Sequence, residues 1–114
     1  MKVAIVGSRN FSNLQRVRDY VVMLPPNAIV ISGGARGVDQ TAAYEAKIRG
    51  LKIVIHYPEW ENLGRAAGFI RNKLIVQDAD KVVAFWDGQS HGTLDTITYA
   101  KSIRKPLEIY VDKQ

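Results

Sequence analysis

The sequence has no cysteine, which excludes disulfide bridges, thiolate metal sites and a cysteine nucleophile. Its only histidines are His56 and His91, so imidazole ligands are scarce and we expect no metal centre. No apolar segment approaches the roughly eighteen residues that a membrane span needs. The first residues run into an apolar segment without a basic leader or cleavage signal. We therefore expect a cytoplasmic protein with no membrane partner.

The composition is typical of one globular domain. The chain has 114 residues, of which 46% are apolar and 24% charged, so we expect residues 1–114 to form a single domain with one site. The formal net charge of +5 favours anionic partners. The basic residues are dispersed along the chain, however, and a solvated surface explains them equally well.

Short apolar runs rich in β-branched residues alternate with segments of helical spacing. The apolar runs are continuous, which is typical of strands covered on both faces. This alternation predicts an α/β fold: a three-layer, doubly wound, Rossmann-like sheet of about five mainly parallel strands. The expected strands are residues 3–6, 28–31, 53–55, 82–86 and 107–111, and the expected helices are residues 14–23, 38–48, 66–76 and 94–103.

The longest expected connection is the loop of residues 56–64. A loop of this length in a compact domain often covers a site, so a lid over a ligand is one interpretation. The alternative is that Tyr57 and Trp60 pack over an edge of the sheet.

Glycine-rich turns follow the first two expected strands. In an open parallel sheet, ligands bind beyond the carboxyl ends of the strands. The first turn, Gly7-Ser8-Arg9-Asn10, combines a flexible backbone with a hydroxyl and a guanidinium. The second, residues 32–39, has three glycines before a helix start, where free N–H groups favour phosphate. Arg36 can add a charged contact, and Asp39 can cap the helix or accept a ribose hydroxyl. Neither turn is a G-x-G-x-x-G or P-loop sequence.

A third glycine-bearing loop, residues 86–93, follows the fourth expected strand. Ser90 and Thr93 can cap the next helix or bind phosphate, and Trp86 stands at the start of the loop. Asn72 interrupts an apolar helical pattern, so it either reaches the site or braces a loop.

These blocks together resemble the SLOG superfamily, which unites the Smf or DNA-processing protein A family with the LOG nucleotide phosphoribohydrolases. The resemblance implies a Rossmann-like domain that binds a nucleotide or nucleotide-derived ligand, without a further cofactor, and that pairs as a dimer. The ligand-binding residues that it implies are Gly7, Ser8, Arg9, Gly33, Gly34, Arg36, Gly37, Asp39, Asn72, Gly88, Ser90, Gly92 and Thr93. Ala35 and Trp86 join this set from their places in the second and third loops.

Three functions stay open at this point. The leading hypothesis is a binding or sensor domain for a nucleotide or an ADP-ribose-like ligand. The second is hydrolysis of the N-glycosidic bond of a nucleoside monophosphate, with Asp39, Asp87 or Asp95 as acid or base. The LOG enzymes use a glutamate where this chain has Thr96, so that reaction would need Asp95 as a substitute. The third is single-stranded DNA binding, with Trp60 or Trp86 stacking on bases.

Overall fold

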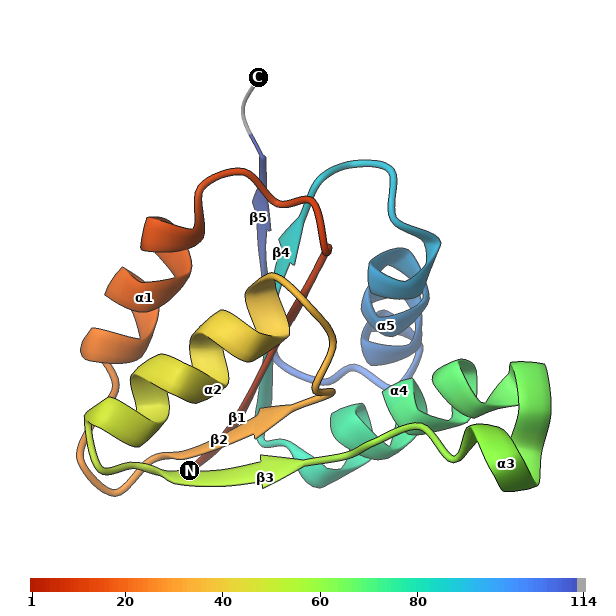
Figure 1. Cartoon of the computed structure of the whole chain (residues 1–114), viewed down its shortest axis with the longest axis horizontal. Coiled ribbons are helices and arrows are strands. Elements are labelled where there is room, and N and C mark those ends of the chain that lie inside the picture. The colour runs from red at the N-terminus through yellow and green to blue at the C-terminus, as the bar shows by residue number, and fades with distance from the viewer. Residues whose placement is uncertain (113–114) are drawn as a thin grey trace.

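The computed structural model describes residues 1–112 and has a sheet of five parallel strands at its centre (Figure 1). The strand order is β3-β2-β1-β4-β5. Both the α/β class and the parallel, Rossmann-like sheet are therefore confirmed. The strands are β1 (Lys2–Gly7), β2 (Ile29–Ser32), β3 (Lys52–Ile55), β4 (Lys81–Trp86) and β5 (Leu107–Val111).

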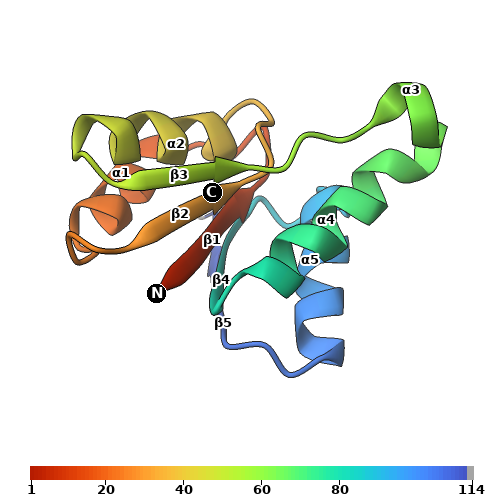
Figure 2. The same cartoon turned by 90° about the horizontal axis from the view of Figure 1, so that it is seen from below.

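Helices cover both faces of the sheet (Figures 1 and 2). One face carries α1 (Leu14–Val22) and α2 (Val38–Ile48), and the other carries α4 (Ala67–Asp78) and α5 (His91–Ser102). All four were expected, with ends that differ by up to three residues. None of the helices within residues 1–112 has the length and apolar character needed to cross a membrane.

Residues 56–64 were expected to form a loop throughout. The structure instead places a short helix, α3 (Trp60–Leu63), within this segment. A 3-10 turn, η1 (Gly64–Ala66), joins α3 to α4. Four residues make hardly more than one helical turn and carry no apolar period, so the sequence pattern could not reveal α3. Together these elements form an arm that projects from the body of the domain (Figure 2).

The central strands separate two apolar cores. In β1, Val3 and Ile5 face the core beneath α1 and α2, whereas Ala4 and Val6 face the core beneath α4 and α5. Alternate residues of a strand point to opposite faces, so a strand buried on both sides must be apolar throughout. This explains why the continuous apolar runs predicted the central strands.

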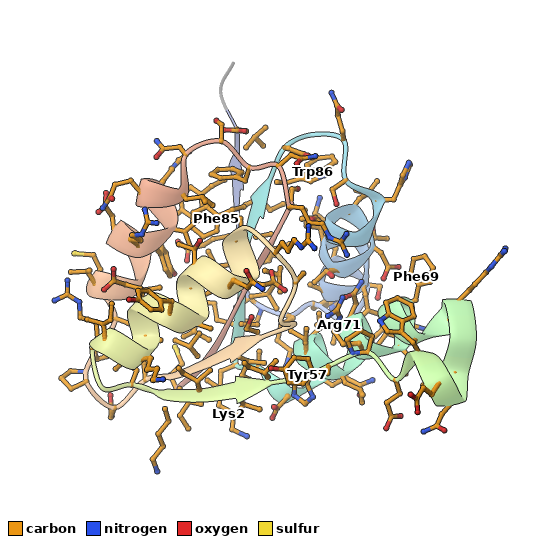
Figure 3. All side chains as sticks on the ribbon, viewed as in Figure 1. Lys2, Tyr57, Phe69, Arg71, Phe85 and Trp86 are labelled. Atoms are coloured by element: carbon orange, nitrogen blue, oxygen red, sulfur yellow. The ribbon has the colours of Figure 1, made fainter. Side chains whose placement is uncertain are left out.

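Phe85, on β4, anchors the core beneath α1 and α2 (Figure 3). Its ring stacks on Tyr110 with 5.2 Å between centroids, and Phe11 and Tyr20 approach it edge-on at 5.5 and 6.1 Å. Tyr20 in turn donates a 2.6 Å hydrogen bond to Glu108, and burial together with this bond raises the pKa of Tyr20 to about 12. The aromatic cluster thus ties α1 and the loop before it to β4 and β5.

We expect Phe85→Ala to lower the free energy of unfolding by about 3 to 5 kcal/mol, because the ring is fully buried and its loss leaves a cavity. Phe69→Ala is the matched control, since Phe69 on α4 is 52% exposed; we expect a change within about 0.5 kcal/mol. Urea denaturation of both variants measures the difference. Equal losses would contradict the placement of this core.

Candidate functional site

The main crevice, of about 470 Å³, lies beyond the carboxyl ends of β1 and β4. β1 and β4 are neighbours in the sheet, but the helices that follow them, α1 and α5, lie on opposite faces. The loops after β1 and β4 therefore diverge. Such a switch point is where open α/β sheets bind ligands. Four segments contribute the lining residues: Val6, Gly7, Arg9 and Asn10; Ala35 and Asp39; Arg71, Asn72 and Ile75; and Asp87, Gln89, Ser90, His91, Gly92, Thr93 and Thr96.

The Asp39 carboxylate joins the first two glycine loops. It accepts a hydrogen bond from the Gly7 N–H at 3.2 Å and another from the Ala35 N–H at 3.3 Å. The residue is only 4% exposed. Burial raises the pKa of Asp39 from 3.8 to about 6, although these N–H groups and the nearby Arg71 guanidinium act in the opposite direction. The crevice therefore has a carboxyl group at its base that titrates near neutral pH.

Arg71 reaches from α4 to the second glycine loop (Figure 3). Its Nη1 donates to the Gly33 carbonyl, and its Nε donates to the Asn72 Oδ1 at 3.0 Å. Burial lowers the pKa of Arg71, while the Asp39 carboxylate raises it and the Arg9 charge lowers it. Arg71 thus supplies the positive charge beside Asp39, and Arg9 lies close enough to add a second one.

Asn72 is buried and locks α4 to α5. Its Nδ2 donates to the Gly92 carbonyl at 3.3 Å and to the Asp95 Oδ2 at 3.2 Å. Both its amide oxygen and its amide nitrogen are therefore engaged by protein groups. Asn72 borders the crevice and also braces it, so the two roles expected for it are compatible.

Three hydroxyl groups meet where β1 approaches α5. The Ser8 and Thr93 hydroxyls lie 3.3 Å apart, and Ser8 Oγ also accepts from the Asp87 N–H at 3.0 Å. Ser90 is the N-cap of α5, because its Oγ accepts from the Thr93 N–H. The capping role expected for Ser90 is therefore present, and His91, Gly92 and Thr93 of the first turn of α5 line the crevice.

Asp87 shapes the loop before α5. Its Oδ1 accepts from the N–H groups of Gln89 and Ser90, both at 2.8 Å. Burial opposes ionisation, but hydrogen bonds from these two N–H groups, from the Ser8 hydroxyl and from the Asp87 N–H together hold the pKa of Asp87 below its usual value. Asp87 is consequently a stable carboxylate at one wall of the crevice.

The structure brings about half of the expected ligand-binding residues to the crevice. Gly7, Arg9, Ala35, Asp39, Asn72, Ser90, Gly92 and Thr93 line it, whereas Ser8, Gly33, Gly34, Arg36, Gly37, Trp86 and Gly88 do not. Of the acid and base candidates, Asp39 and Asp87 line the crevice, and Asp95 contacts it only through Asn72.

Two of the expected residues outside the crevice, Trp86 and Gly37, have structural contacts instead. Trp86 is half-buried, and its Nε1 donates to the Ser90 carbonyl at 3.0 Å, so it supports the loop before α5. Gly37 has a φ of +80°, and a Cβ there would lie 2.6 Å from the Arg9 carbonyl oxygen. A side chain at this position would push the first two loops apart, so this glycine serves their close packing.

Sequence reasoning missed Arg71 as a lining residue. The signal for it was present: a charged residue next to Asn72 within an otherwise apolar helical pattern. Asn10, Gln89 and His91 also line the crevice, and all three come from the loops that the sequence singled out.

The arm does not act as the expected lid in this conformation, because none of residues 56–66 lines the crevice. α3 lies at the tip of the arm, away from the sheet (Figure 2). The alternative expectation was packing over an edge of the sheet. Tyr57 instead lies against Gly34 of the second glycine loop, and the Trp60 ring lies against Gly68 of α4. Both aromatic side chains remain more than half exposed.

Asp39 predicts a pH-dependent stability difference between the wild type and Asp39→Asn. Because folding raises this pKa, the contribution of Asp39 to stability is complete below pH 3.8 and is lost as the pH rises through 6. From pH 4 to pH 7.5, we expect the stability of the wild type relative to Asp39→Asn to fall by about 2 kcal/mol. Urea denaturation at the two pH values measures this change.

Val38→Ala is the control, since Val38 is an equally buried neighbour that does not titrate. Its stability difference from the wild type should be the same at both pH values. A difference for Asp39→Asn that is equally constant would show that the carboxyl does not titrate in this range.

Comparison with known proteins adds to this geometry. The family model of DNA recombination-mediator protein A matches residues 1–55, which include the first two glycine loops. No curated protein matches the chain.

Two solved structures share the fold. DNA processing protein A from Helicobacter pylori, described with a single-stranded DNA binding mode, is 22% identical with a TM-score of 0.75; the match covers 96% of this chain and 64% of that one. DNA processing protein A from Streptococcus pneumoniae is 21% identical with a TM-score of 0.82, and the match covers 95% of this chain and 49% of that one. This chain therefore spans less than two thirds of either protein. The resemblance to the SLOG superfamily is confirmed, since this chain has the fold of DNA processing protein A and its first 55 residues match that protein's family model.

Proposed function

We propose that the chain binds single-stranded DNA, with the phosphates of the strand in the crevice between β1 and β4. The observation that carries this proposal is the convergence of Arg9, Arg71 and the start of α5 on one crevice at the switch point of the sheet. Free N–H groups and the positive end of a helix dipole favour phosphate there. The Helicobacter pylori protein, described with a single-stranded DNA binding mode, supports the choice of ligand.

Arg9 is the residue best placed to neutralise a phosphate. It is exposed, and within residues 1–112 its side chain makes no hydrogen bond or ion pair. Arg71, in contrast, is half-buried and already donates to Gly33 and Asn72. We therefore assign phosphate contact to Arg9 and electrostatic support to Arg71, which compensates the buried Asp39 carboxylate.

Single strands suit this crevice better than duplexes. The lining is mostly polar, with hydroxyl, amide and N–H groups supplied by Asn10, Gln89, Ser90 and Thr93. A flexible strand can turn successive phosphates toward such a groove and leave its bases free to stack elsewhere. A duplex keeps its bases stacked inside and presents a stiff backbone.

Salt dependence tests the proposal. We expect the affinity for a fluorescent oligothymidylate to fall as salt rises, because each phosphate neutralised releases counterions and adds about 0.7 to the slope of log K against log salt. Arg9→Ala should weaken binding and reduce that slope by about 0.7. Fluorescence anisotropy across a salt series measures both quantities.

Arg49→Ala is the charge-matched control. Arg49 follows α2 at the opposite edge of the sheet and pairs with Glu45, so its loss should leave the slope unchanged. If Arg9→Ala and Arg49→Ala reduce the slope equally, binding is a diffuse charge effect and the crevice is not its site.

A mononucleotide is the second candidate ligand, because the crevice volume of about 470 Å³ lies within the range of small-molecule sites. A ligand at one hundred times its dissociation constant stabilises a protein by about 2.7 kcal/mol. At equal phosphate concentration, we expect the oligothymidylate to raise the melting temperature more than AMP or ADP-ribose does. A larger shift with AMP or ADP-ribose would favour the nucleotide-binding function instead.

Hydrolysis of an N-glycosidic bond and pairing of two copies stay predictions of the resemblance. All three acid or base candidates already accept hydrogen bonds from protein groups: Asp39 and Asp87 each accept from two N–H groups, and Asp95 accepts from Asn72. Release of free base from a nucleotide panel tests the reaction, and sedimentation tests the pairing.

A further inference from the structure

The Asp39 carboxylate and the Arg71 guanidinium meet at one point of the main crevice, which both residues line. A Cβ on Gly33 would lie 2.8 Å from Asp39 Oδ2 and 2.6 Å from Arg71 Nη1, so a side chain at this position would collide with both groups. Within residues 1–112, no hydrogen bond or ion pair joins Asp39 directly to Arg71. The two charges therefore act on each other through space, across Gly33.

This pairing makes the attraction of the crevice for anions depend on the charge of Asp39. We propose that phosphate binding in the crevice is coupled to the uptake of a proton by Asp39, so that the protein binds DNA more tightly at acidic than at alkaline pH. The inference rests on the proposed function and concerns its regulation. When Asp39 is ionised, it offsets the Arg71 charge; when it is protonated, that charge acts on the phosphate in full. The bound phosphate in turn favours the protonated carboxyl, because a nearby like charge disfavours ionisation.

The surroundings of Asp39 leave its two charge states nearly balanced near neutral pH. Only 4% of the residue is exposed, and this burial disfavours the carboxylate. The Ala35 N–H, the Arg71 guanidinium and the Gly7 N–H favour it, and the pKa of Asp39 that results is about 6. A group so close to its midpoint responds to one additional charge beside it, and the phosphate supplies that charge.

Each element around Asp39 contributes a charged or titratable group to the crevice. Arg71 comes from α4 and Arg9 from the loop after β1, and guanidinium groups keep their charge in proteins. Asp87, in the loop before α5, stays ionised because its hydrogen bonds hold its pKa below the usual value. His91, at the start of α5, is the competing group, because imidazoles can gain a proton near neutral pH. The experiment must therefore separate Asp39 from His91.

The first measurement follows the affinity for an oligothymidylate from pH 5 to pH 8 at constant ionic strength, by fluorescence anisotropy with a pH-insensitive dye. The oligothymidylate keeps its charge in this range, so any dependence comes from the protein. For the wild type, we expect about tenfold tighter binding at pH 5, the effect of one unit charge about 10 Å from the phosphate at an effective dielectric constant of about 20. Asp39→Asn should abolish this difference and bind at pH 8 about as tightly as the wild type does at pH 5.

Two variants are the controls. Asp19→Asn also removes one carboxylate, but Asp19 is exposed on α1 and does not line the crevice, so this variant should keep the tenfold difference. His91→Gln removes the competing imidazole and should keep most of it. A difference that disappears in His91→Gln and survives in Asp39→Asn would overturn the proposal.

Nuclear magnetic resonance observes the carboxyl group directly in the wild type. The carbon-13 chemical shift of the Asp39 carboxyl, followed against pH, gives the midpoint of its titration in the free protein and in the complex with the oligothymidylate. We expect the midpoint to rise by about one pH unit on binding, which corresponds to a tenfold change in affinity. An unchanged midpoint overturns the proposal, including the case in which Asp39→Asn does not fold.

The outcomes separate the coupling from the binding itself. If the wild type binds equally well at pH 5 and pH 8 while Arg9→Ala still weakens binding, the coupling falls and the crevice proposal stands. If the wild type binds at neither pH, both proposals fall. A tenfold difference that Asp39→Asn removes, together with a raised midpoint in the complex, supports the coupling.

Discussion

The Asp39 carboxylate is the interaction on which the rest of the site depends. Asp39 lies in the first turn of α2, accepts hydrogen bonds from N–H groups of the loops after β1 and β2, and lies near the Arg71 guanidinium of α4. These contacts join both faces of the sheet at its carboxyl edge. Without them, the first loop would have no polar link to the second, and Arg71 would be a partly buried cation without a compensating charge.

Close backbone packing is the second constraint, and it explains why several of the glycines in the loops are needed. A Cβ on Gly7 would lie 2.5 Å from the Phe85 carbonyl oxygen and 2.6 Å from Val38, so this glycine lets β1, β4 and α2 meet. Gly37 does the same for the first two loops. Glycines in such a motif thus bring the ligand-binding groups together, and only some of them border the crevice themselves.

The fold and the place of the site were largely predictable, because both follow from local patterns. Continuous apolar runs indicated strands buried on both faces. Because the carboxyl ends of parallel strands lie at the same edge of a sheet, the loops after β1, β2 and β4 were predicted to lie together. The missed residue, Arg71, depends on non-local packing, and the misplaced one, Trp86, depends on the conformation of its own loop. Arg71 reaches the crevice only because α4 crosses behind β1, and Trp86 misses it because its indole N–H bonds to Ser90. Gly33, the partner of Arg71, is 38 residues away in the sequence, and Ser90, the partner of Trp86, is four residues away across a glycine-bearing loop whose shape the sequence pattern does not specify.

The charge balance of the crevice explains where its affinity for anions must come from. Arg71 and the Asp39 carboxylate lie together, so when both are ionised their charges largely cancel for a ligand outside them. Asp87 adds a negative charge to the opposite wall. The net attraction for phosphate therefore depends on Arg9 and on the N–H groups at the start of α5. One exposed arginine and a helix end are individually weak, each contributing about 1 kcal/mol at moderate salt. A ligand that repeats its phosphate along a chain can compensate for weak single contacts by making several at once, which favours a polymer over a mononucleotide.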